Sequence, residues 1–376
     1  MSIFIEVKGI GIPNKGAELM LVALMEHFAQ KGTDVKFVSE PYTDYFNRAR
    51  YGLYQRASFA VKGIRLDWIW SLVPARLRKQ YGIVLDREIN VILDASGFAY
   101  GDQWGVDKLV SRLSKRLKKY KLNGTKVILM PQAFGPFKNA GFESALKDLA
   151  EHADLICVRD RESYQHLTSI VGKSENIEQF PDFTGLVLPS EHSVHNDMNY
   201  GICFIPNAKM IEMRDDGERY KAEMTKAARW AYQNGYKVTL LVHEGIKDMN
   251  LAKEIKAKVD DKILILGASD PKEIKQIISR SCIVVSSRFH GLVSALSQGV
   301  PAVATGWSHK YMELMHDYNV EEMMVEDLQD ISKKLQWVCI EENAESIKAK
   351  LNKSAISQKQ HIALMWDKID SILKLN

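Results

Sequence analysis

Cysteine is scarce in this chain: four occur among 376 residues, and no two of them form a CxxC pair. A disulfide framework, a zinc site and a redox dithiol are therefore not expected. Each cysteine lies inside an apolar run, so all four are predicted to be small buried thiols. They are Cys157, Cys203, Cys282 and Cys339.

Long hydrophobic runs are also missing. The longest weakly charged stretch, 282–307, is interrupted by Arg288, His290 and Pro301, so no transmembrane segment is predicted. The first eight residues already contain charged side chains and do not have the shape of an export signal. The expected location is the cytoplasm, and peripheral contact with the inner face of the membrane is left open.

A strong charge of one sign is absent as well. Lys and Arg number 51 and Asp and Glu 47, which gives a net charge of +4. This excess suits mildly anionic ligands and is too small to indicate nucleic acid. The 46% hydrophobic and 26% charged residues are typical of a globular protein, and the length predicts about two to three domains.

Short apolar segments alternate with longer amphipathic ones, which is typical of parallel sheets with crossover helices. The predicted strands are 2–8, 34–39, 90–95, 125–132, 154–159 and 176–181, then 200–205, 236–243, 262–266, 282–286 and 301–304. The predicted helices are 17–31, 106–122, 142–152 and 161–171, then 218–234, 249–259, 271–281 and 292–297. The fold class is therefore α/β, with two doubly wound, Rossmann-like domains and C-terminal helices. The expected bounds are 1–188 and 200–340 for the domains, 189–199 for a linker and 341–376 for a helical tail.

One segment, the insert of residues 41–88, does not follow the alternation. It is dense in aromatic and basic side chains: Tyr42, Tyr45, Phe46, Tyr51, Tyr54, Trp68, Trp70 and Tyr81 beside Arg48, Arg50, Arg56, Arg76, Arg78 and Lys79. Such side chains stack on sugar rings or contact anionic lipid headgroups. The alternative is a helical excursion that packs on the first domain.

The most informative motif is Ser287-Arg-Phe-His-Gly291, where a buried strand ends and a helix begins. Ligands of open α/β sheets bind at the carboxyl ends of strands, and helix N-termini attract anions. Arg288 offers a bidentate fork, and His290 can bind phosphate or deliver a proton. The next strand ends before His309 and Lys310, so two neighbouring strand ends are predicted to present cations to one anionic ligand. A structural role for Arg288 and His290, and a solvated Lys310, are the alternatives.

Together these segments resemble the polysaccharide pyruvyl transferase family. The matching positions are Gly11-Ile-Pro-Asn-Lys-Gly16, Pro131-Gln-Ala-Phe-Gly-Pro-Phe137, Arg159-Asp-Arg-Glu-Ser163, Pro181-Asp182, Ser287 to Leu292, Gly299-Val-Pro301 and Lys310-Tyr311. Two positions depart from the family pattern: Ala17 stands where an aspartate is frequent, and the loop after Asp94 has fewer glycines.

The resemblance implies a fold like that of the GT-B glycosyltransferases and transfer of pyruvate from phosphoenolpyruvate to two hydroxyls of a sugar, giving a cyclic ketal and phosphate. It implies that Arg288 and His290 hold the donor, with Gly291, His309 and Lys310 beside them. His290 is the expected phosphate ligand or general acid, and Glu18 is the leading candidate for the base, with Asp94 second. The acceptor side is assigned to Asn14, Gln132, Arg159 and Asp182. No cofactor and no metal are expected.

Two other functions remain open from the sequence alone. A GT-B glycosyltransferase that uses a nucleotide sugar would place a diphosphate at the same helix start. A non-catalytic glycan-binding relative would keep the fold, and Ala17 favours it. The sugar, its two hydroxyls, a free or lipid-linked acceptor and the oligomeric state are not determined by the sequence.

Overall fold

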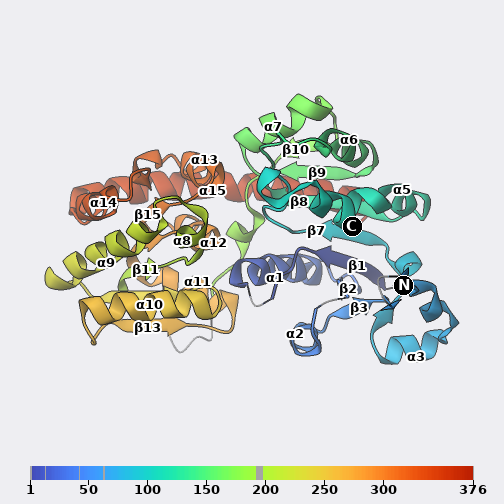
Figure 1. The fold of residues 1–376 in the computed structure, drawn as a ribbon, viewed down its shortest axis with the longest axis horizontal. Coiled ribbons are helices and arrows are strands. Elements are labelled where there is room, and N and C mark those ends of the chain that lie inside the picture. Colours follow the sequence, from blue (N-terminus) through green and yellow to red (C-terminus); the bar gives the residue numbers. More distant parts are fainter. Residues whose placement is uncertain (1, 13, 42, 62–63, 192–197, 376) are drawn as a thin grey trace. The chain divides into compact units, whose positions relative to one another are not determined.

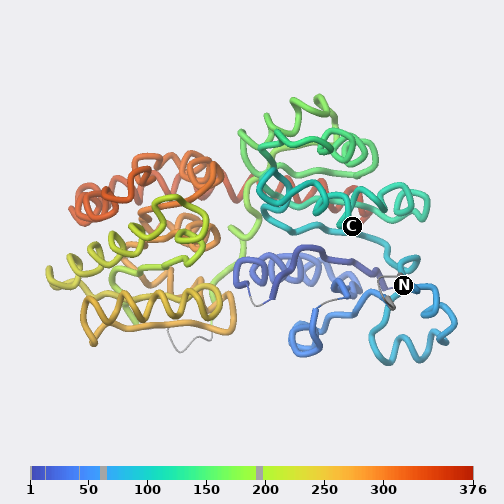
Figure 2. Tube along the Cα trace, in the orientation of Figure 1, coloured from blue at the N-terminus to red at the C-terminus, as the bar shows by residue number. Residues whose placement is uncertain are grey.

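A computed structural model describes residues 2–12, 14–41, 43–61, 64–191 and 198–375. Contacts along the chain separate two compact units. The first comprises residues 1–12, 20–181 and 364–376, and the second comprises 13–19 and 182–363. The colour gradient of Figure 2 follows the chain through the first unit, then the second, and back to the first at the C-terminus.

The first unit is built on a parallel sheet of eight strands in the order β10-β9-β8-β7-β1-β2-β3-β6. Its central strands are apolar runs buried on both faces, as expected where helices cover both sides of a sheet. The strands are β1 (Ile3–Lys8), β2 (Val35–Ser39), β3 (Tyr54–Arg56), β6 (Ile83–Val84), β7 (Val91–Asp94), β8 (Lys126–Gln132), β9 (Leu155–Val158) and β10 (Ile177–Gln179).

Two groups of helices belong to this sheet (Figure 1). On one side α5 packs against α6 and α6 against α7. On the other, His27 of α1 stacks on Trp366 of the C-terminal helix α15, with ring centroids 3.8 Å apart. The helices are α1 (Lys15–Gln30), α2 (Tyr45–Arg50), α3 (Ala75–Gln80), α4 (Val106–Leu109), α5 (Lys115–Leu122), α6 (Phe142–His152), α7 (Arg161–Val171) and α15 (Glu341–Leu373).

The second unit has a parallel sheet of six strands in the order β13-β12-β11-β14-β15-β16. Helices α9, α10 and α14 pack together, and α11 packs on α12, so the sheet is again doubly wound. The strands are β11 (Gly201–Ile205), β12 (Val238–Val242), β13 (Leu264–Gly267), β14 (Ser281–Ser286), β15 (Ala302–Thr305) and β16 (Met324–Val325). The helices are α8 (Lys209–Met213), α9 (Gly217–Gln233), α10 (Gly245–Val259), α11 (Pro271–Ser279), α12 (Phe289–Leu296), α13 (His309–Asp317) and α14 (Asp330–Val338).

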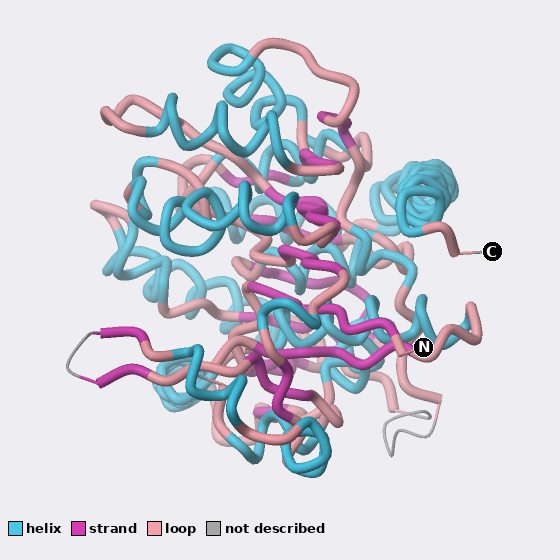
Figure 3. Tube along the Cα trace, turned by 90° about the vertical axis from the view of Figure 1, so that its right-hand side faces the viewer, coloured by secondary structure: helices cyan, strands magenta, loops and turns pink. Residues whose placement is uncertain are grey.

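The insert combines regular sheet with exposed helix. Its strands β3 and β6 continue the eight-stranded sheet beyond β2, whereas β4 (Ala60–Val61) and β5 (Ile64–Arg65) form a separate antiparallel ribbon that projects from the unit (Figure 3). Helix α2, the 3₁₀ helix η1 (Asp67–Leu72) and α3 complete it. The insert is therefore not only a helical excursion that packs on the first domain, because two of its strands join the sheet. Tyr42 lies outside the described residues.

Three expectations differ from the structure. The first unit ends at residue 181 rather than 188, and residues 192–197 of the expected linker lie outside the described part. The helical tail is one helix, but its residues are divided between the two units after residue 363. Two of the four cysteines are not buried: Cys282 is exposed and Cys339 is half-buried. Among the described residues, no helix is both long and apolar enough to cross a bilayer.

Candidate active site

The Arg-Phe-His motif lies at the carboxyl end of β14, as its sequence predicts. Ser286 ends the strand, and its Oγ accepts a hydrogen bond from the backbone N–H of Arg288 at 3.0 Å. Arg288 is the N-terminal cap of α12. The glycine at 291 permits close packing, because a Cβ there would lie 3.0 Å from the Ser286 Oγ and 3.1 Å from the Ile205 side chain.

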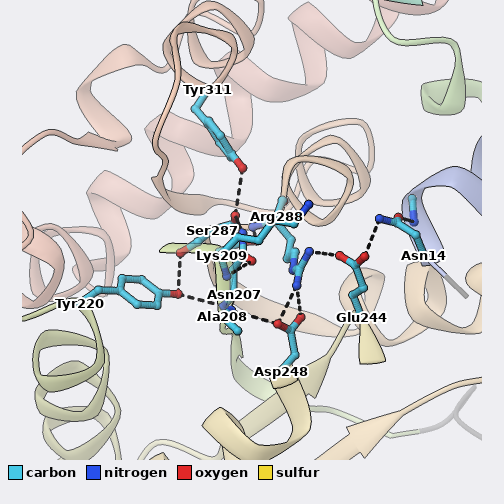
Figure 4. A network of polar contacts seen from close by, with 12 residues as sticks. Asn14, Asn207, Ala208, Lys209, Tyr220, Glu244, Asp248, Ser287, Arg288 and Tyr311 are labelled. Atoms are coloured by element: carbon cyan, nitrogen blue, oxygen red, sulfur yellow. Dashed lines mark hydrogen bonds and ion pairs between the residues drawn. The ribbon is translucent and has the colours of Figure 1, made fainter. Parts of the chain in front are cut away.

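The guanidinium of Arg288 is held between two carboxylates (Figure 4). Nη2 donates to both oxygens of Asp248 at 2.6 Å, and Nη1 donates to Glu244. Burial by itself lowers the pKa of Arg288, but the negative charges of Asp248 and Glu244 outweigh it and raise the pKa. The Nε of Arg288 is buried and has no hydrogen-bond partner among the described residues. Arg288 is therefore fully charged, and the hydrogen-bonding capacity of its buried Nε–H is unused among the described residues.

Glu244 connects this arginine to the N-terminal glycine-rich loop. Its second carboxylate oxygen accepts a hydrogen bond from Nδ2 of Asn14 at 2.8 Å, while Oδ1 of Asn14 caps helix α1 by accepting from the backbone N–H groups of Gly16 and Ala17. The sequence assigned Asn14 to the acceptor side. In the structure it belongs to the second unit and lies in the same network as Arg288 (Figure 4).

Ser287 is the centre of a second, fully buried set of hydrogen bonds. Its Oγ pairs with the Tyr220 hydroxyl at 2.7 Å and the Thr305 hydroxyl at 2.8 Å. Its carbonyl accepts from the Asn207 side chain at 2.7 Å and from the Tyr311 hydroxyl at 3.2 Å. These bonds join the end of β14 to β15 and to helices α9 and α13, so they fix the backbone that carries Arg288.

Lys310, the second residue of α13, lies among three aromatic rings. Its Nζ is 5.0 Å from the ring centroid of Trp307, 5.2 Å from that of Tyr311 and 5.4 Å from that of Phe289. Rings at this distance stabilise the charged ammonium. Because Phe289 stands between Arg288 and His290 in the chain, the structure brings the two predicted cationic strand ends together. His309, half-buried, is the first residue of α13.

His290 lies between a carboxylate and the glycine-rich loop. Its Nε2 is 3.5 Å from an oxygen of Asp182, whose other oxygen caps the following 3₁₀ turn by accepting from Thr184. On the other side, Gly16 approaches so closely that a Cβ there would lie 2.3 Å from His290 Nδ1. The glycine at 16 is thus needed for the imidazole to occupy this position.

Glu18, considered from the sequence as the general base, is fully buried and forms an ion pair with Lys15 at 2.8 Å. Lys15 also donates to the carbonyl of Ser269 at 2.7 Å. In this geometry Glu18 neutralises Lys15 and helps to anchor the start of α1. Its role as base remains a prediction.

Three site residues were missed by the sequence interpretation: His243, Glu244 and Asp248. They follow β12, but helix α10 was expected to begin at residue 249 and begins at Gly245. The signal was present, because His243 and Glu244 are polar side chains directly after a buried strand. Burial lowers the pKa of His243 well below its usual value, and the nearby charges of Arg288, His290 and Lys15 act in the same direction, so this histidine is neutral.

The first unit carries its own polar strand ends. Asp94, the last residue of β7, is fully buried; one oxygen accepts from the Ser96 backbone N–H at 3.2 Å and from its hydroxyl, and the other from the Tyr100 hydroxyl. Arg112 donates to the Ser96 hydroxyl at 2.5 Å. Burial, with the Asp94 charge, raises the pKa of Tyr100 well above its usual value, so the tyrosine is a permanent donor.

Gln132 ends the neighbouring strand β8 and is fully buried. Neither its Oε1 nor its Nε2 has a hydrogen-bond partner among the described residues. An unpaired buried amide is costly, which makes it a candidate for binding a ligand. Arg159 follows β9, and its backbone N–H donates to the Gln132 carbonyl at 3.0 Å, so the two predicted acceptor residues lie on adjacent strand ends.

Among the described residues, no group of three or more His, Cys, Asp or Glu side chains could hold a metal ion.

The chain matches the family model of the polysaccharide pyruvyl transferases over residues 14–309. The protein belongs to the polysaccharide pyruvyl transferase family. No curated protein matches this chain significantly.

Solved structures show that this pyruvyl transferase family member has the GT-B fold. A glycosyltransferase from Rickettsia africae superposes with a TM-score of 0.59 at 12% identity, covering 100% of this chain and 99% of that one. HepE of Anabaena in complex with UDP-glucose gives 0.58 at 13% identity, with 100% and 99% covered. UDP-GlcNAc 2-epimerase from Neisseria meningitidis bound to UDP-GlcNAc gives 0.59 at 9% identity, with 98% and 99% covered. At these identities the likeness concerns the fold alone.

Proposed function

We propose that the protein transfers pyruvate from phosphoenolpyruvate to two hydroxyls of a sugar in a polysaccharide or its lipid-linked precursor. The products are a cyclic ketal and phosphate. Family membership supports the reaction class, and the residues of the second unit support the donor. The observation that supports the proposal is the position of Arg288 and His290 just after β14 and of Lys310 in the helix that follows the neighbouring strand β15.

Donor binding would use the charges and free N–H groups at this point. Phosphoenolpyruvate carries a phosphate and a carboxylate, and arginine is well suited to both. The buried Nε of Arg288 points to one contact that the protein itself leaves unfilled. Lys310 supplies a second cation, and the first turns of α12 and α13 supply backbone donors.

The chemistry requires a proton on the methylene carbon of the donor. Protonation produces an oxocarbenium-like centre, which the first sugar hydroxyl attacks; the second hydroxyl then displaces phosphate. Of the two hydroxyl protons released, one balances the proton taken up by carbon and the other leaves with phosphate. His290 is the proposed proton donor because an imidazole can deliver a proton near neutral pH, and the Asp182 carboxylate lies 3.5 Å from its Nε2.

The acceptor would be held through hydroxyl groups. Gln132 offers both a donor and an acceptor on one buried amide, which is the pairing that a sugar hydroxyl needs. Arg159 lies on the adjacent strand end. Asp94 is the second candidate for the base, but its two oxygens already accept hydrogen bonds from Ser96 and Tyr100.

The test is incubation of the protein with phosphoenolpyruvate and a panel of galactose, mannose and N-acetylmannosamine acceptors. We expect release of phosphate and a pyruvyl group on one acceptor by mass spectrometry. Gln132→Leu should raise the KM for the acceptor and leave donor affinity unchanged. Absence of both products with every acceptor, together with no binding of phosphoenolpyruvate by calorimetry, would contradict the proposal.

A nucleotide-sugar glycosyltransferase is the second candidate, because proteins of the same fold were solved with UDP and UDP-glucose. The two functions differ in their donors. We expect phosphoenolpyruvate to raise the melting temperature of the protein, whereas UDP and GDP should leave it unchanged. The reverse result would favour the glycosyltransferase, and binding of glycan with neither donor would favour a non-catalytic relative.

A further inference from the structure

The positive charge of this protein is concentrated in the insert. Residues 41–88 contain nine Lys and Arg and four Asp and Glu, a net charge of +5. The whole chain has a net charge of +4, so the other residues together carry −1. The excess that seemed too small to identify a partner is therefore a local property of this one segment.

Exposed apolar side chains gather in the same segment. Seven of the 17 large apolar side chains that are exposed in the described residues belong to the insert, although it is about an eighth of the chain. They are Tyr45, Phe46, Phe59, Trp68, Leu72, Leu77 and Tyr81. Single exposed apolar residues are normal, but a group of them marks an interaction surface.

The densest part is the docking segment, residues 67–81, which comprises η1 and α3. Trp68 is 61% exposed, Leu72 is 72% exposed and Tyr81 is 71% exposed. The cations Arg76 and Lys79 are exposed on the same short stretch. Indole, phenol and aliphatic groups beside Lys and Arg are the composition of surfaces that lie at a membrane interface.

The docking segment is firmly attached to the fold from behind. Nε1 of Trp70 donates to the Ser58 carbonyl at 3.1 Å. Arg78 forms a bidentate pair with Glu88 at 2.7 and 2.8 Å, and its Nε donates to the Val73 carbonyl at 3.2 Å. The backbone that carries the exposed side chains is thus held by Trp70 and Arg78, whose polar groups are bonded within the insert.

Helix α3 also closes a pocket of about 490 Å³ in the first unit. Part of its wall is apolar, with Phe4, Tyr54 and Ile83 among the lining residues. Lys36, Lys79 and the Arg78–Glu88 pair also line it. Because the Glu88 carboxylate is already paired with Arg78, an apolar wall beside two lysines suits the glycerol and phosphate of a phospholipid headgroup. Lys79 belongs both to this pocket and to the docking segment, so the two features are continuous.

We propose that the docking segment binds the surface of a bilayer that contains anionic phospholipids. Each Lys or Arg close to such a surface contributes about tenfold or less to affinity, and the apolar side chains add their transfer from water. A nucleic acid would be bound by the cations and by stacking of bases on Trp68 or Tyr81, but it would gain nothing from Leu72 or Leu77. This surface brings the protein to the place where a lipid-linked acceptor is found, but the binding itself does not depend on the proposed reaction.

The test is sedimentation of the full-length protein with vesicles of phosphatidylcholine alone or with about a third of phosphatidylglycerol. We expect binding only to the anionic vesicles, and weaker binding at high salt. The double variant Trp68→Ser/Leu72→Ser should lose about tenfold or more in partition coefficient, and Arg76→Ser/Lys79→Ser should lose about tenfold or more. All four side chains are exposed, so both variants should keep the melting temperature of the wild type.

Matched variants outside the insert provide the control. Leu122→Ser/Ile356→Ser removes exposed apolar groups, and Lys253→Ser/Lys353→Ser removes two exposed cations. Both should bind anionic vesicles like the wild type. The proposal is overturned by equal binding to both vesicle types, by an equal loss in the control variants, or by tighter binding to a DNA duplex than to the anionic vesicles.

Discussion

Arg288 donates from one nitrogen to both carboxylate oxygens of Asp248, each at 2.6 Å, and Asp248 is fully buried. Asp248 also accepts from the backbone N–H of Ala208 at 3.0 Å. Burial raises the pKa of Asp248, and the adjacent Arg288 opposes that shift. The pair therefore fixes the position of the guanidinium. Burial removes both charges from water, and this desolvation energy is offset only while both partners are present.

Removal of this carboxylate should destabilise the second unit. We expect Asp248→Ala to lower the free energy of unfolding by about 3–5 kcal/mol, because it leaves the Arg288 charge with one fewer buried partner. Urea denaturation followed by circular dichroism measures the loss. The exposed Asp261→Ala should change stability by less than about 0.5 kcal/mol. A similar small change for Asp248→Ala would show that the pair is not a structural anchor.

Under the proposed function, Glu244 would compete with phosphoenolpyruvate for the Arg288 guanidinium. Its replacement in Glu244→Gln keeps an oxygen for Asn14 but removes the negative charge beside the guanidinium. We expect the affinity for phosphoenolpyruvate to increase about fivefold, which corresponds to about 1 kcal/mol. Calorimetry measures it, with the exposed Glu218→Gln as the control. A tenfold decrease instead would mean that the Glu244 charge positions Arg288 for the donor.

Arg288 and His290 should separate binding from turnover. Arg288→Lys retains the charge that faces Asp248 and Glu244 but loses the fork, so donor affinity should fall about tenfold or more. His290→Ala should keep most of the donor affinity and lose about 10²–10⁴ in kcat, the usual contribution of a general acid. Calorimetry and phosphate release on the same preparations compare the two. Equal effects of both variants on binding and on kcat would contradict the assigned roles.

The sequence predicted most of the framework because its main strands are apolar segments of four to seven residues that alternate with amphipathic ones. All eleven predicted strands are present, whereas β3, β4, β5, β6 and β16 were missed, since runs of two or three residues carry no periodic signal. The cationic strand ends were found for a similar reason: Arg288 follows the buried strand β14, and Lys310 lies at the start of the helix after the buried strand β15. What could not be predicted is pairing across the fold, such as Asn14 with Glu244, 230 positions apart.

His243 makes the stability of the second unit depend on pH. Its pKa is lowered in the folded state by burial and by the charges of Arg288, His290 and Lys15, whereas in the unfolded chain it is about 6.5. As the pH falls below about 6.5, the unfolded state takes up a proton that the folded state does not, so stability decreases by up to about 1.4 kcal/mol per pH unit.

The variant His243→Asn cannot take up this proton in either state. We expect its melting temperature to fall less than that of the wild type between about pH 7.5 and pH 5.5, whatever its stability at the higher pH. Differential scanning calorimetry at several pH values measures the difference in slope. The control is the exposed His361→Asn, which should keep the slope of the wild type. Identical slopes for His243→Asn and the wild type would show that His243 is not held neutral.

Disturbing the contact between Gly16 and His290 should lower kcat more than it lowers the free energy of unfolding. A Cβ at position 16 would lie 2.3 Å from His290 Nδ1, so Gly16→Ala must displace the imidazole. Gly16 lies in the first turn of α1, where alanine favours the helix, and the folded state should lose little. We expect kcat to fall about as far as in His290→Ala, with donor affinity nearly unchanged. Gly11→Ala, at a position with no atom within 4 Å of the added Cβ, should keep full activity. If Gly16→Ala also keeps full activity, the position of His290 against this loop is not required for proton transfer.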